Sequence, residues 1–372
     1  MAIGFIRKFA KWFFISLNIL ICAIFLVACL SPFLNPHNWA FTGFLSLAVP
    51  YLATLLILFI IFWLVVKPVR AFIPLITLLI GWKQLSVIWA WHPSQKFNET
   101  KSDSTIRIIT WNVRGMFGLS NSGYTQLQNR AQIAALINNY NPDIVCLQEF
   151  NTSYLETDPE WHNIILFTQK CPYYFFARDM NSSHFVSGTI LFSKYPIIDS
   201  VKIKFPGNAA ESLIYADILK GKDTLRVFTT HLQSFQFTAS DYENLEKIKE
   251  QNKEALQASE NLYSKMKLGY SSRGIQADMV RNFLDKSPYP SIVCGDFNDV
   301  PNSYTYFRIR HDKQDAFLSA SFGIGRSYNA IAPTLRIDYI LPDDNFQIQQ
   351  FDMVDEGLSD HHMLITDLSL KK

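Results

Sequence analysis

Several short apolar runs in this 372-residue sequence end in a side chain that carries an oxygen or an imidazole group. Asn112, Glu149 and Asp360 supply hard oxygen donors, which suit Mg²⁺ or Mn²⁺ better than zinc. His231 and His361 are able to donate hydrogen bonds to anionic oxygens. Together these residue types predict chemistry on a negatively charged substrate beside a divalent cation.

Two pairs of residues make the predicted chemistry more specific. Asp338 is a carboxylate able to fix the tautomer and the orientation of His361. Asp296 and Asn298 are two positions apart, so both side chains point the same way if the segment is extended. One of the two can then take a proton while the other positions a phosphoryl oxygen. The set fits phosphoester hydrolysis, in which a metal and an imidazole stabilise charge on the non-bridging oxygens.

The elements that must position these side chains are short runs rich in Val, Ile, Phe and Tyr, as is typical of buried strands. They lie at residues 106–112, 144–149, 188–193, 224–231, 291–296, 335–341 and 362–366. Helical spacing of apolar residues occurs between them, at Arg130–Asn139, Asp241–Leu268 and Arg273–Leu284. We predict one α/β domain over residues 105–372, in which strand ends on one side of a sandwich of sheets gather the polar residues into a cleft.

The same segments resemble the endonuclease/exonuclease/phosphatase superfamily. The matching pieces occur in the family's order and cover essentially the whole predicted domain; they are Thr110-Trp111-Asn112, Leu147-Gln148-Glu149, Ser187-Gly188-Thr189, Thr230-His231-Leu232, Gly295-Asp296-Phe297-Asn298, Arg336-Ile337-Asp338-Tyr339-Ile340 and Ser359-Asp360-His361. Each piece alone is a weak signal, but seven in order are a strong one. The resemblance implies a DNase I-like fold, a two-sheet sandwich flanked by helices.

The resemblance also implies roles at the matched positions that would hold a metal. Glu149 would be the principal metal ligand, with Asn112 and Asp360 nearby. The cofactor implied is Mg²⁺ or Mn²⁺, and both one and two metal ions remain open.

At the remaining matched positions, the resemblance implies roles in the reaction. Asp296 would align or deprotonate the attacking water, while Asn298 and His231 would hold the phosphate. His361, paired with Asp338, would contact the phosphoryl group and stabilise its charge.

The charge distribution argues against a large surface for nucleic acid. The first 92 residues contain six basic residues and no acidic one, which leaves 28 basic and 32 acidic residues in the remainder. Non-specific nucleic-acid binding needs clustered Lys and Arg, and no basic, aromatic-interleaved loop lies in the long insertion between His231 and Arg273. The five cysteines show no CxxC or Cys/His spacing, so neither a disulfide framework nor a zinc site is indicated.

The first 92 residues have the composition of a membrane region. No charged residue occurs from Trp12 to Val66, and the run is interrupted once, around Pro32 to Asn38. It predicts two helical spans, Trp12–Leu30 and Phe41–Val66, each near or above the roughly 20 residues that cross a bilayer.

A third segment, Val69–Trp91, is long enough to span but contains Lys83 and Pro74. We expect a third span here, with an interfacial helix as the alternative. The basic residues before the first span and after the second place both flanks in the cytoplasm by the positive-inside rule. Three spans then put the domain on the extracytoplasmic side, as we predict, whereas two spans would leave it in the cytoplasm. Residues 93–104 are expected to form a short polar linker near the bilayer.

These features predict an integral membrane protein that hydrolyses a phosphoester. The short linker at residues 93–104 and the acidic domain favour a lipid or lipid-linked phosphate as the substrate. Similar apolar amino-terminal regions precede this domain in some bacterial membrane proteins of the family. One alternative is a membrane-anchored nuclease. Another is a catalytically silent phospholipid-binding module, against which the presence of Glu149, Asp296, Asn298 and His361 argues.

Overall fold

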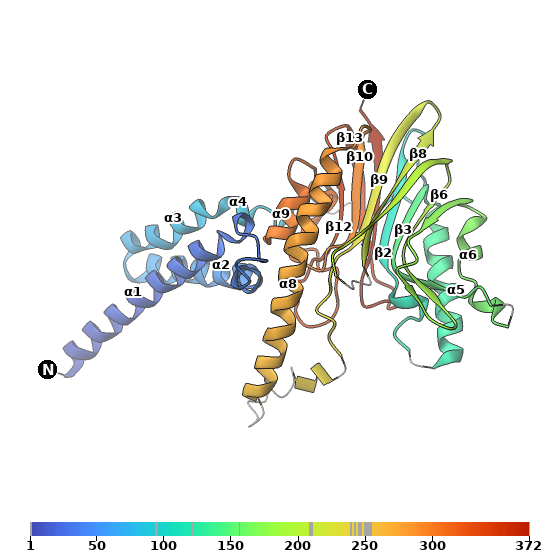
Figure 1. Ribbon diagram of the computed structural model, residues 1–372. Coiled ribbons are helices and arrows are strands. Elements are labelled where there is room, and N and C mark those ends of the chain that lie inside the picture. Colours follow the sequence, from blue (N-terminus) through green and yellow to red (C-terminus); the bar gives the residue numbers. More distant parts are fainter. Residues whose placement is uncertain are drawn as a thin grey trace.

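The chain folds into a body with two β-sheets and an apolar helical arm that projects from it (Figure 1). The computed structural model describes residues 2–371 except 94–95, 121, 156, 208–210, 239, 242, 245–247 and 249–254. The amino terminus lies at the far tip of the arm, and the carboxyl terminus lies on the body.

The body is a sandwich of a seven-stranded and a five-stranded sheet. In the first sheet the strand order is β13 (Phe346–Val354), β14 (Met363–Leu370), β2 (Ile106–Asn112), β3 (Ile144–Thr152), β6 (Val186–Ser193) and β4 (Tyr173–Phe176), with β5 (Met180–Asn181) also paired to β6. In the second sheet the order is β12 (Asp338–Pro342), β10 (Ser291–Asp296), β9 (Asp223–His231), β8 (Ser212–Lys220) and β7 (Ile197–Lys204). The predicted α/β sandwich is therefore confirmed.

Each sheet contains one parallel strand pair near its centre. β2 and β3 are parallel and are connected through helix α5 (Gly123–Asn139). β9 and β10 are parallel and are connected through helix α8 (Ala255–Asp285). Long crossover connections are what parallel pairs require, and they place the carboxyl ends of both strands at one edge of the sheet.

Apolar side chains fill three layers of the body. Between the sheets lie residues such as Ile108, Cys146, Val227 and Cys294, all inaccessible to solvent. The outer face of the seven-stranded sheet packs on α5, and the outer face of the five-stranded sheet packs on α8 and α9 (Tyr304–Arg310). The smaller elements of the body are α6 (Ile165–Thr168), α10 (Ala316–Ala320), β11 (Phe322–Gly323) and the 3₁₀ turns η3 (Arg114–Met116) and η4 (Pro159–Trp161).

The insertion before Arg273 differs from the prediction. The two helices expected at Asp241–Leu268 and Arg273–Leu284 are joined, because α8 runs without a break from Ala255 to Asp285. Residues 245–247 and 249–254 of the first expected helix lie outside the described residues.

The body also begins earlier than residue 105. Strand β1 (Ala90–Trp91) pairs with β11, and Phe97 is buried in the cluster around α5. The buried Arg107 guanidinium donates hydrogen bonds to the carbonyl oxygens of Asn98 and Glu99. Where the stretch 93–104 is described, it is bound to the body and does not hang free as a linker.

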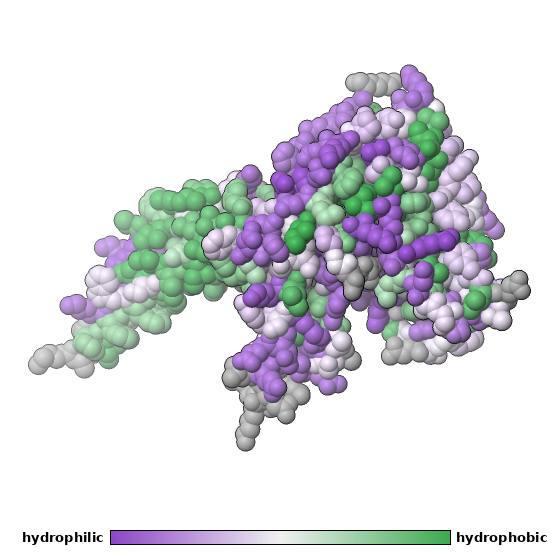
Figure 2. Space-filling model, viewed as in Figure 1, coloured by the Kyte–Doolittle hydropathy of each residue, from purple (hydrophilic) through white to green (hydrophobic). Residues whose placement is uncertain are grey.

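The arm consists of α1 (Ala2–Ala28), α2 (Phe41–Val66) and a return segment made of η2 (Pro68–Ala71), α3 (Phe72–Ile80) and α4 (Trp82–Leu85). Two helices, at Phe5–Phe33 and Phe41–Val66, are long and apolar enough to cross a membrane. Only 33% and 22% of their most apolar windows are buried, so neither resembles the core helix of a soluble protein. Figure 2 shows the arm as a mostly hydrophobic surface beside a more polar body.

The expectation of a single third span over Val69–Trp91 is wrong. The segment breaks at Gly81, where the Phe25 ring occupies the space that a Cβ atom would need, and its last two residues form strand β1. The chain nevertheless returns to the body end of α1, where Gln84 donates a hydrogen bond to the Cys29 carbonyl oxygen. The return segment is thus made of short, broken helices.

The arm contacts the body through the turn between α1 and α2 and the adjoining part of α2. The turn between α1 and α2, which contains η1 (Ser31–Phe33), reaches α8 through hydrogen bonds from Asn35 to the Gly274 carbonyl and the Asp278 carboxylate. In the first turns of α2, the Ser46 carbonyl accepts a hydrogen bond from Asn302, 2.5 Å away. Since α2 is 26 residues long, Lys67 at its other end lies roughly 40 Å from this joint.

Candidate active site

All eight residues predicted for the site lie at one edge of the sandwich. Asn112 and Glu149 come from the ends of parallel strands β2 and β3, and His231 and Asp296 from the ends of parallel strands β9 and β10. β12 and β14 run antiparallel to their neighbours, so their amino-terminal ends lie at the same edge. They bring the remaining residues: Asp338 begins β12, Asp360 and His361 precede β14, and Asn298 follows β10. Six of the eight line one cavity, namely Glu149, His231, Asp296, Asn298, Asp360 and His361.

Glu149 occupies an irregular position in its strand. Its φ angle is +51°, and the pairing of β3 with β6 shifts between Leu147 and Phe150. A bulge of this kind re-aims a side chain, and the Glu149 carboxylate is 44% exposed in an otherwise buried strand. The buried Asn112 amide donates hydrogen bonds to Glu149 Oε1 at 3.0 Å and to Asp296 Oδ2 at 3.1 Å, and so joins the two sheets.

His231 faces the same two carboxylates without bonding to either. Its Nε2 atom is buried and lacks a hydrogen-bond partner among the described residues, and it lies 3.8 Å from Glu149 Oε1 and 3.6 Å from Asp296 Oδ2. A buried polar atom without a partner is costly unless a ligand, ion or water completes it. The position therefore points to a group that binds between these three side chains.

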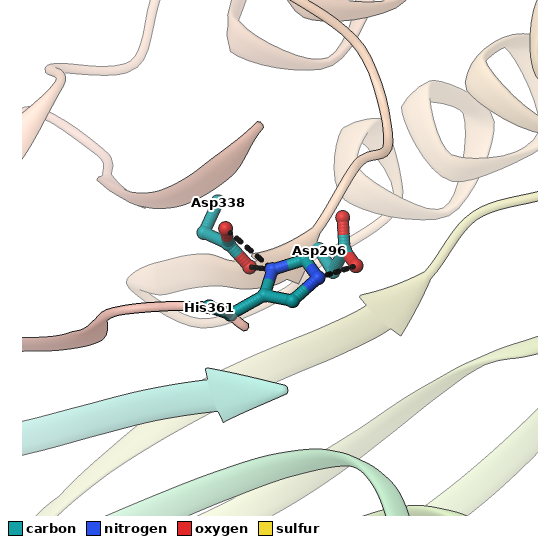
Figure 3. Close-up of side chains that lie close together, drawn as sticks. All are labelled: Asp296, Asp338 and His361. Carbon is teal, nitrogen blue, oxygen red and sulfur yellow. Dashed lines mark hydrogen bonds and ion pairs between the residues drawn. The ribbon is translucent and has the colours of Figure 1, made fainter. Parts of the chain in front are cut away.

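His361 lies between two aspartates. Its Nδ1 atom is 3.0 Å from Asp338 Oδ2, and its Nε2 atom is 3.7 Å from Asp296 Oδ2 (Figure 3). Asp338 is itself held by the hydroxyl of Ser327, which donates a hydrogen bond to Asp338 Oδ2 at 2.7 Å. This chain of contacts fixes the imidazole plane and directs Nε2 toward the cavity.

The charges in this group are strongly coupled. Burial lowers the pKa of His361, but the carboxylates of Asp338 and Asp296 outweigh burial and raise that pKa to about 10. Burial raises the pKa of Asp338, and the charge of His361 opposes the rise. We conclude that the pair is an imidazolium and a carboxylate at neutral pH, so that His361 presents a cationic hydrogen-bond donor to the cavity.

Asn298 and Asp360 both line the cavity, but the sequence did not predict the backbone turn at Asn298 or the contact of Asp360 with Arg114. The segment after Asp296 is a turn, not the extended strand expected: Asn298 has a φ angle of +52°, and its backbone N–H donates to Asp296 Oδ1 at 2.8 Å. The Asn298 amide donates to the Leu232 carbonyl oxygen, which fixes the side chain beside the β9 end. The Asp360 carboxylate is partly exposed and lies 3.9 Å from Arg114 Nε.

The donor atoms at this edge fit a hard divalent cation. Mg²⁺ is usually held by one or two carboxylates and keeps several waters, and the exposed Glu149 carboxylate beside the Asn112 amide offers such a position. Asp296, Asp338 and His361 also place one ligand atom each within 4.8 Å of one another. Asp338 in this second group already binds His361 Nδ1, whereas the exposed Glu149 carboxylate is open to a cation.

Three polar residues near the site were not anticipated from the sequence. Ser327 belongs to a loop without a periodic pattern, and only the fold brings it to Asp338. Arg114 lines the cleft beside Glu149. Its position two residues after Asn112 could have identified it as a site residue. Glu211 is buried next to His231 in that cleft, and its Oε2 atom has no partner among the described residues. Burial raises the pKa of Glu211, while the charge of His231 opposes the rise.

One wall of the cavity is apolar and includes the arm. It is formed by Phe235, Phe237, Tyr270, Ile331, Leu335 and, from α2, Leu47. Phe235 and Phe237 belong to the insertion after β9, where their rings stack with centroids 5.3 Å apart. The cavity therefore runs from the carboxylates at the sheet edge to the first turns of an apolar helix.

Comparisons with known proteins agree with this geometry. The family model described as Endonuclease/Exonuclease/phosphatase matches residues 109–361, and a model described as a domain of unknown function matches residues 10–88. Among curated proteins, no sequence matches the chain.

The chain is also similar to solved structures. The endonuclease/exonuclease/phosphatase from Beutenbergia cavernae DSM 12333 has a TM-score of 0.51 at 19% identity, and the match covers 72% of each chain. The human Nocturnin catalytic domain with bound sulfate anion has a TM-score of 0.49 at 17% identity, covering 72% of this chain and 94% of that one. Since the family model spans more than half of the sequence, the chain belongs to the Endonuclease/Exonuclease/phosphatase family of phosphoester hydrolases.

Proposed function

We propose that this protein is a membrane-embedded hydrolase that uses a divalent cation, Mg²⁺ or Mn²⁺, to cleave a phosphoester in a lipid or lipid-linked substrate. The observation that carries the proposal is the composition of a single cavity. Glu149, Asp296 and His361 line it together with Leu47 of the apolar helix α2. A substrate with a phosphate and a hydrocarbon chain matches this mixed lining.

The proposed chemistry assigns each polar side chain one task. A cation held by Glu149, with Asn112 and Asp360 nearby, would neutralise charge on the phosphoryl oxygens. Asp296, fixed by hydrogen bonds from Asn112 and the Asn298 backbone, takes the proton of the attacking water.

The two histidines and Asn298 serve the phosphoryl group. His361 Nε2 donates to a phosphoryl oxygen, and Asp338 keeps the imidazole oriented and charged. His231 and Asn298 hold the phosphate from the β9 and β10 side.

The apolar wall favours a lipid over nucleic acid. Ile331 is 53% exposed, lines the cavity and has a φ angle of +68°. A β-branched residue in the left-handed region is strained, and such strain often marks functional positions. An exposed, strained isoleucine contributes nothing to the recognition of a phosphate backbone, but it can contact a hydrocarbon chain.

The way the body is attached to the arm supports an extracytoplasmic position of the body. The body contacts the turn between α1 and α2, whereas Arg7, Lys8, Lys11, Lys67 and Arg70 lie toward the opposite end of the two long helices. If α1 and α2 span the bilayer with the basic end in the cytoplasm, the body lies on the extracytoplasmic side. The broken return segment supplies the third passage that this arrangement needs.

Loss of either proposed catalytic side chain should abolish most of the turnover. For the purified full chain with Mg²⁺, we expect Asp296→Ala and His361→Ala each to lower kcat by about 10²–10⁴-fold, because each removes a group that acts in the transition state. EDTA should stop the wild-type reaction and added Mg²⁺ or Mn²⁺ should restore it. His362→Ala is the matched control, since His362 contacts Asn329 and Asp355 and not the cavity. Full activity of Asp296→Ala on every phosphoester tested would contradict the mechanism.

The substitution Ile331→Asn tests the substrate class. Asparagine tolerates the left-handed backbone, so the fold should not suffer, but the contact with a hydrocarbon chain is lost. We expect kcat/KM for a long-chain lipid phosphodiester to fall about tenfold and that for a short, water-soluble phosphodiester to fall much less. Ile198→Asn removes an equally exposed isoleucine from β7 and should change neither value. Turnover of DNA alone, with no lipid phosphoester cleaved, would favour the nuclease alternative.

Cysteine labelling tests the side of the membrane. All five native cysteines are buried, so an engineered cysteine at exposed Lys222 on the body or Lys8 on α1 should react selectively. With a membrane-impermeant maleimide on right-side-out vesicles, we expect Lys222→Cys to be labelled at once and Lys8→Cys only after detergent is added. Labelling of Lys222→Cys only after detergent is added would place the body in the cytoplasm.

A further inference from the structure

A second cavity lies where the arm, the return segment and the body meet. Its walls come from η1, from α4 with the turn that follows it, and from α9 with the turn that follows it. The residues are Pro32, Phe33, Lys83, Gln84, Ser86, Val87, Tyr304, Phe307, Arg308, Arg310, His311 and Asp312. None of them lines the candidate active site, so this cavity is a separate feature of the joint.

Two cations in this cavity have no carboxylate partner among the described residues. The Lys83 ammonium group lies over the rings of Phe33 and Phe307, at 6.0 and 5.9 Å from their centroids. The Arg310 guanidinium lies 5.6 Å from the Tyr306 ring, and its Nε atom donates to the Lys313 carbonyl oxygen. Both groups therefore keep N–H donors for an anion.

The other charges in the cavity are already paired. Arg308 Nε lies 2.5 Å from Asp278 Oδ1. Asp312, the one acidic residue in the lining, contacts both Arg281 and His311. Arg310 also interacts electrostatically with the buried Asp315, but that carboxylate is ion-paired with Arg336. With Asp312 engaged as well, Lys83 and Arg310 leave the cavity with a net positive charge.

The position of the cavity indicates which anion it meets. It lies at the body end of α1 and α2, which is one boundary of the bilayer if these helices span it. Large aromatic side chains are exposed at the same end, with Phe33 63%, Trp39 52% and Trp82 59% accessible. Exposed tryptophans at helix ends are typical of the headgroup level of a membrane, where lipid phosphates also lie.

We propose that this cavity binds the headgroup phosphate of an anionic phospholipid from the surrounding bilayer. Lys83 and Arg310 contact the phosphate oxygens, and the exposed rings of Phe33 and Trp82 lie against the adjoining hydrocarbon. The bound lipid joins the return segment to α9 and fixes the height of the body above the membrane. The inference rests on the proposed membrane embedding but not on the proposed hydrolysis.

The test compares lipid-dependent stabilisation of the full chain in detergent. Mixed micelles with phosphatidylglycerol should raise the melting temperature of the wild type more than micelles with phosphatidylcholine do, since ligand bound only to the folded state stabilises it. The double variant Lys83→Gln/Arg310→Gln should reduce that difference by about threefold or more, because it removes both unpaired cations. Lys83→Arg keeps the charge and should retain most of the response. Lys204→Gln/Lys222→Gln, which removes two exposed lysines outside the cavity, should behave as the wild type.

Three results would overturn the inference. The first is an equal phosphatidylglycerol response in the wild type and in Lys83→Gln/Arg310→Gln. The second is an equal response to phosphatidylcholine and phosphatidylglycerol. The third is full stabilisation by soluble glycerol phosphate, which would show a site for free anions.

Two further measurements on the same samples separate this inference from the proposed function. Extraction of the wild type from membranes by carbonate would contradict membrane embedding and the lipid site together. Turnover of a soluble phosphodiester reports the active site alone. Retained turnover with no lipid selectivity would therefore overturn only the lipid site.

Discussion

Two parallel strand pairs, one in each sheet, end at the same edge of the sandwich, and the contacts of Asn112, Glu149, His231 and Asp296 depend on that arrangement. β2 and β3 deliver Asn112 and Glu149, while β9 and β10 deliver His231 and Asp296. The Asn112 amide then joins the pairs by donating to a carboxylate from each sheet. A small shift between the sheets would break both hydrogen bonds, so the packed layer of apolar residues between the sheets is a condition for the site's geometry.

The arm is attached to the loop that follows Asp296 and carries Asn298. Asn302, which bonds to Ser46 of α2, follows Asp296 by only six positions. Gly43 of α2 lies directly against the Tyr270 ring, which leaves no room for a larger residue. Close packing of this kind fixes Leu47 in the wall of the cavity, so the apolar helix contributes to its lining.

Much of the fold was predictable because the informative residues lie at the ends of short apolar runs. The strands expected at 106–112 and 291–296 match β2 and β10, and the polar residues at their ends, Asn112 and Asp296, are joined by a hydrogen bond. Hydropathy located α1 and α2 but not the break at Gly81, where the Phe25 ring of a neighbouring helix fills the space of a side chain. Ser327 and Leu47 were also beyond prediction, since each reaches the site only through tertiary contacts that no local pattern encodes.

The central claim is that side chains distant in the sequence converge on one divalent cation at the Glu149 side of the cavity. Anomalous diffraction from Mn²⁺-soaked crystals of the full chain tests it most directly. The account predicts a manganese peak in direct contact with the Glu149 carboxylate, on the side of the cavity that Asn112 and Asp360 flank, and no such peak in Glu149→Gln. A manganese ion bound elsewhere in the chain, or bound equally well in Glu149→Gln, would contradict it.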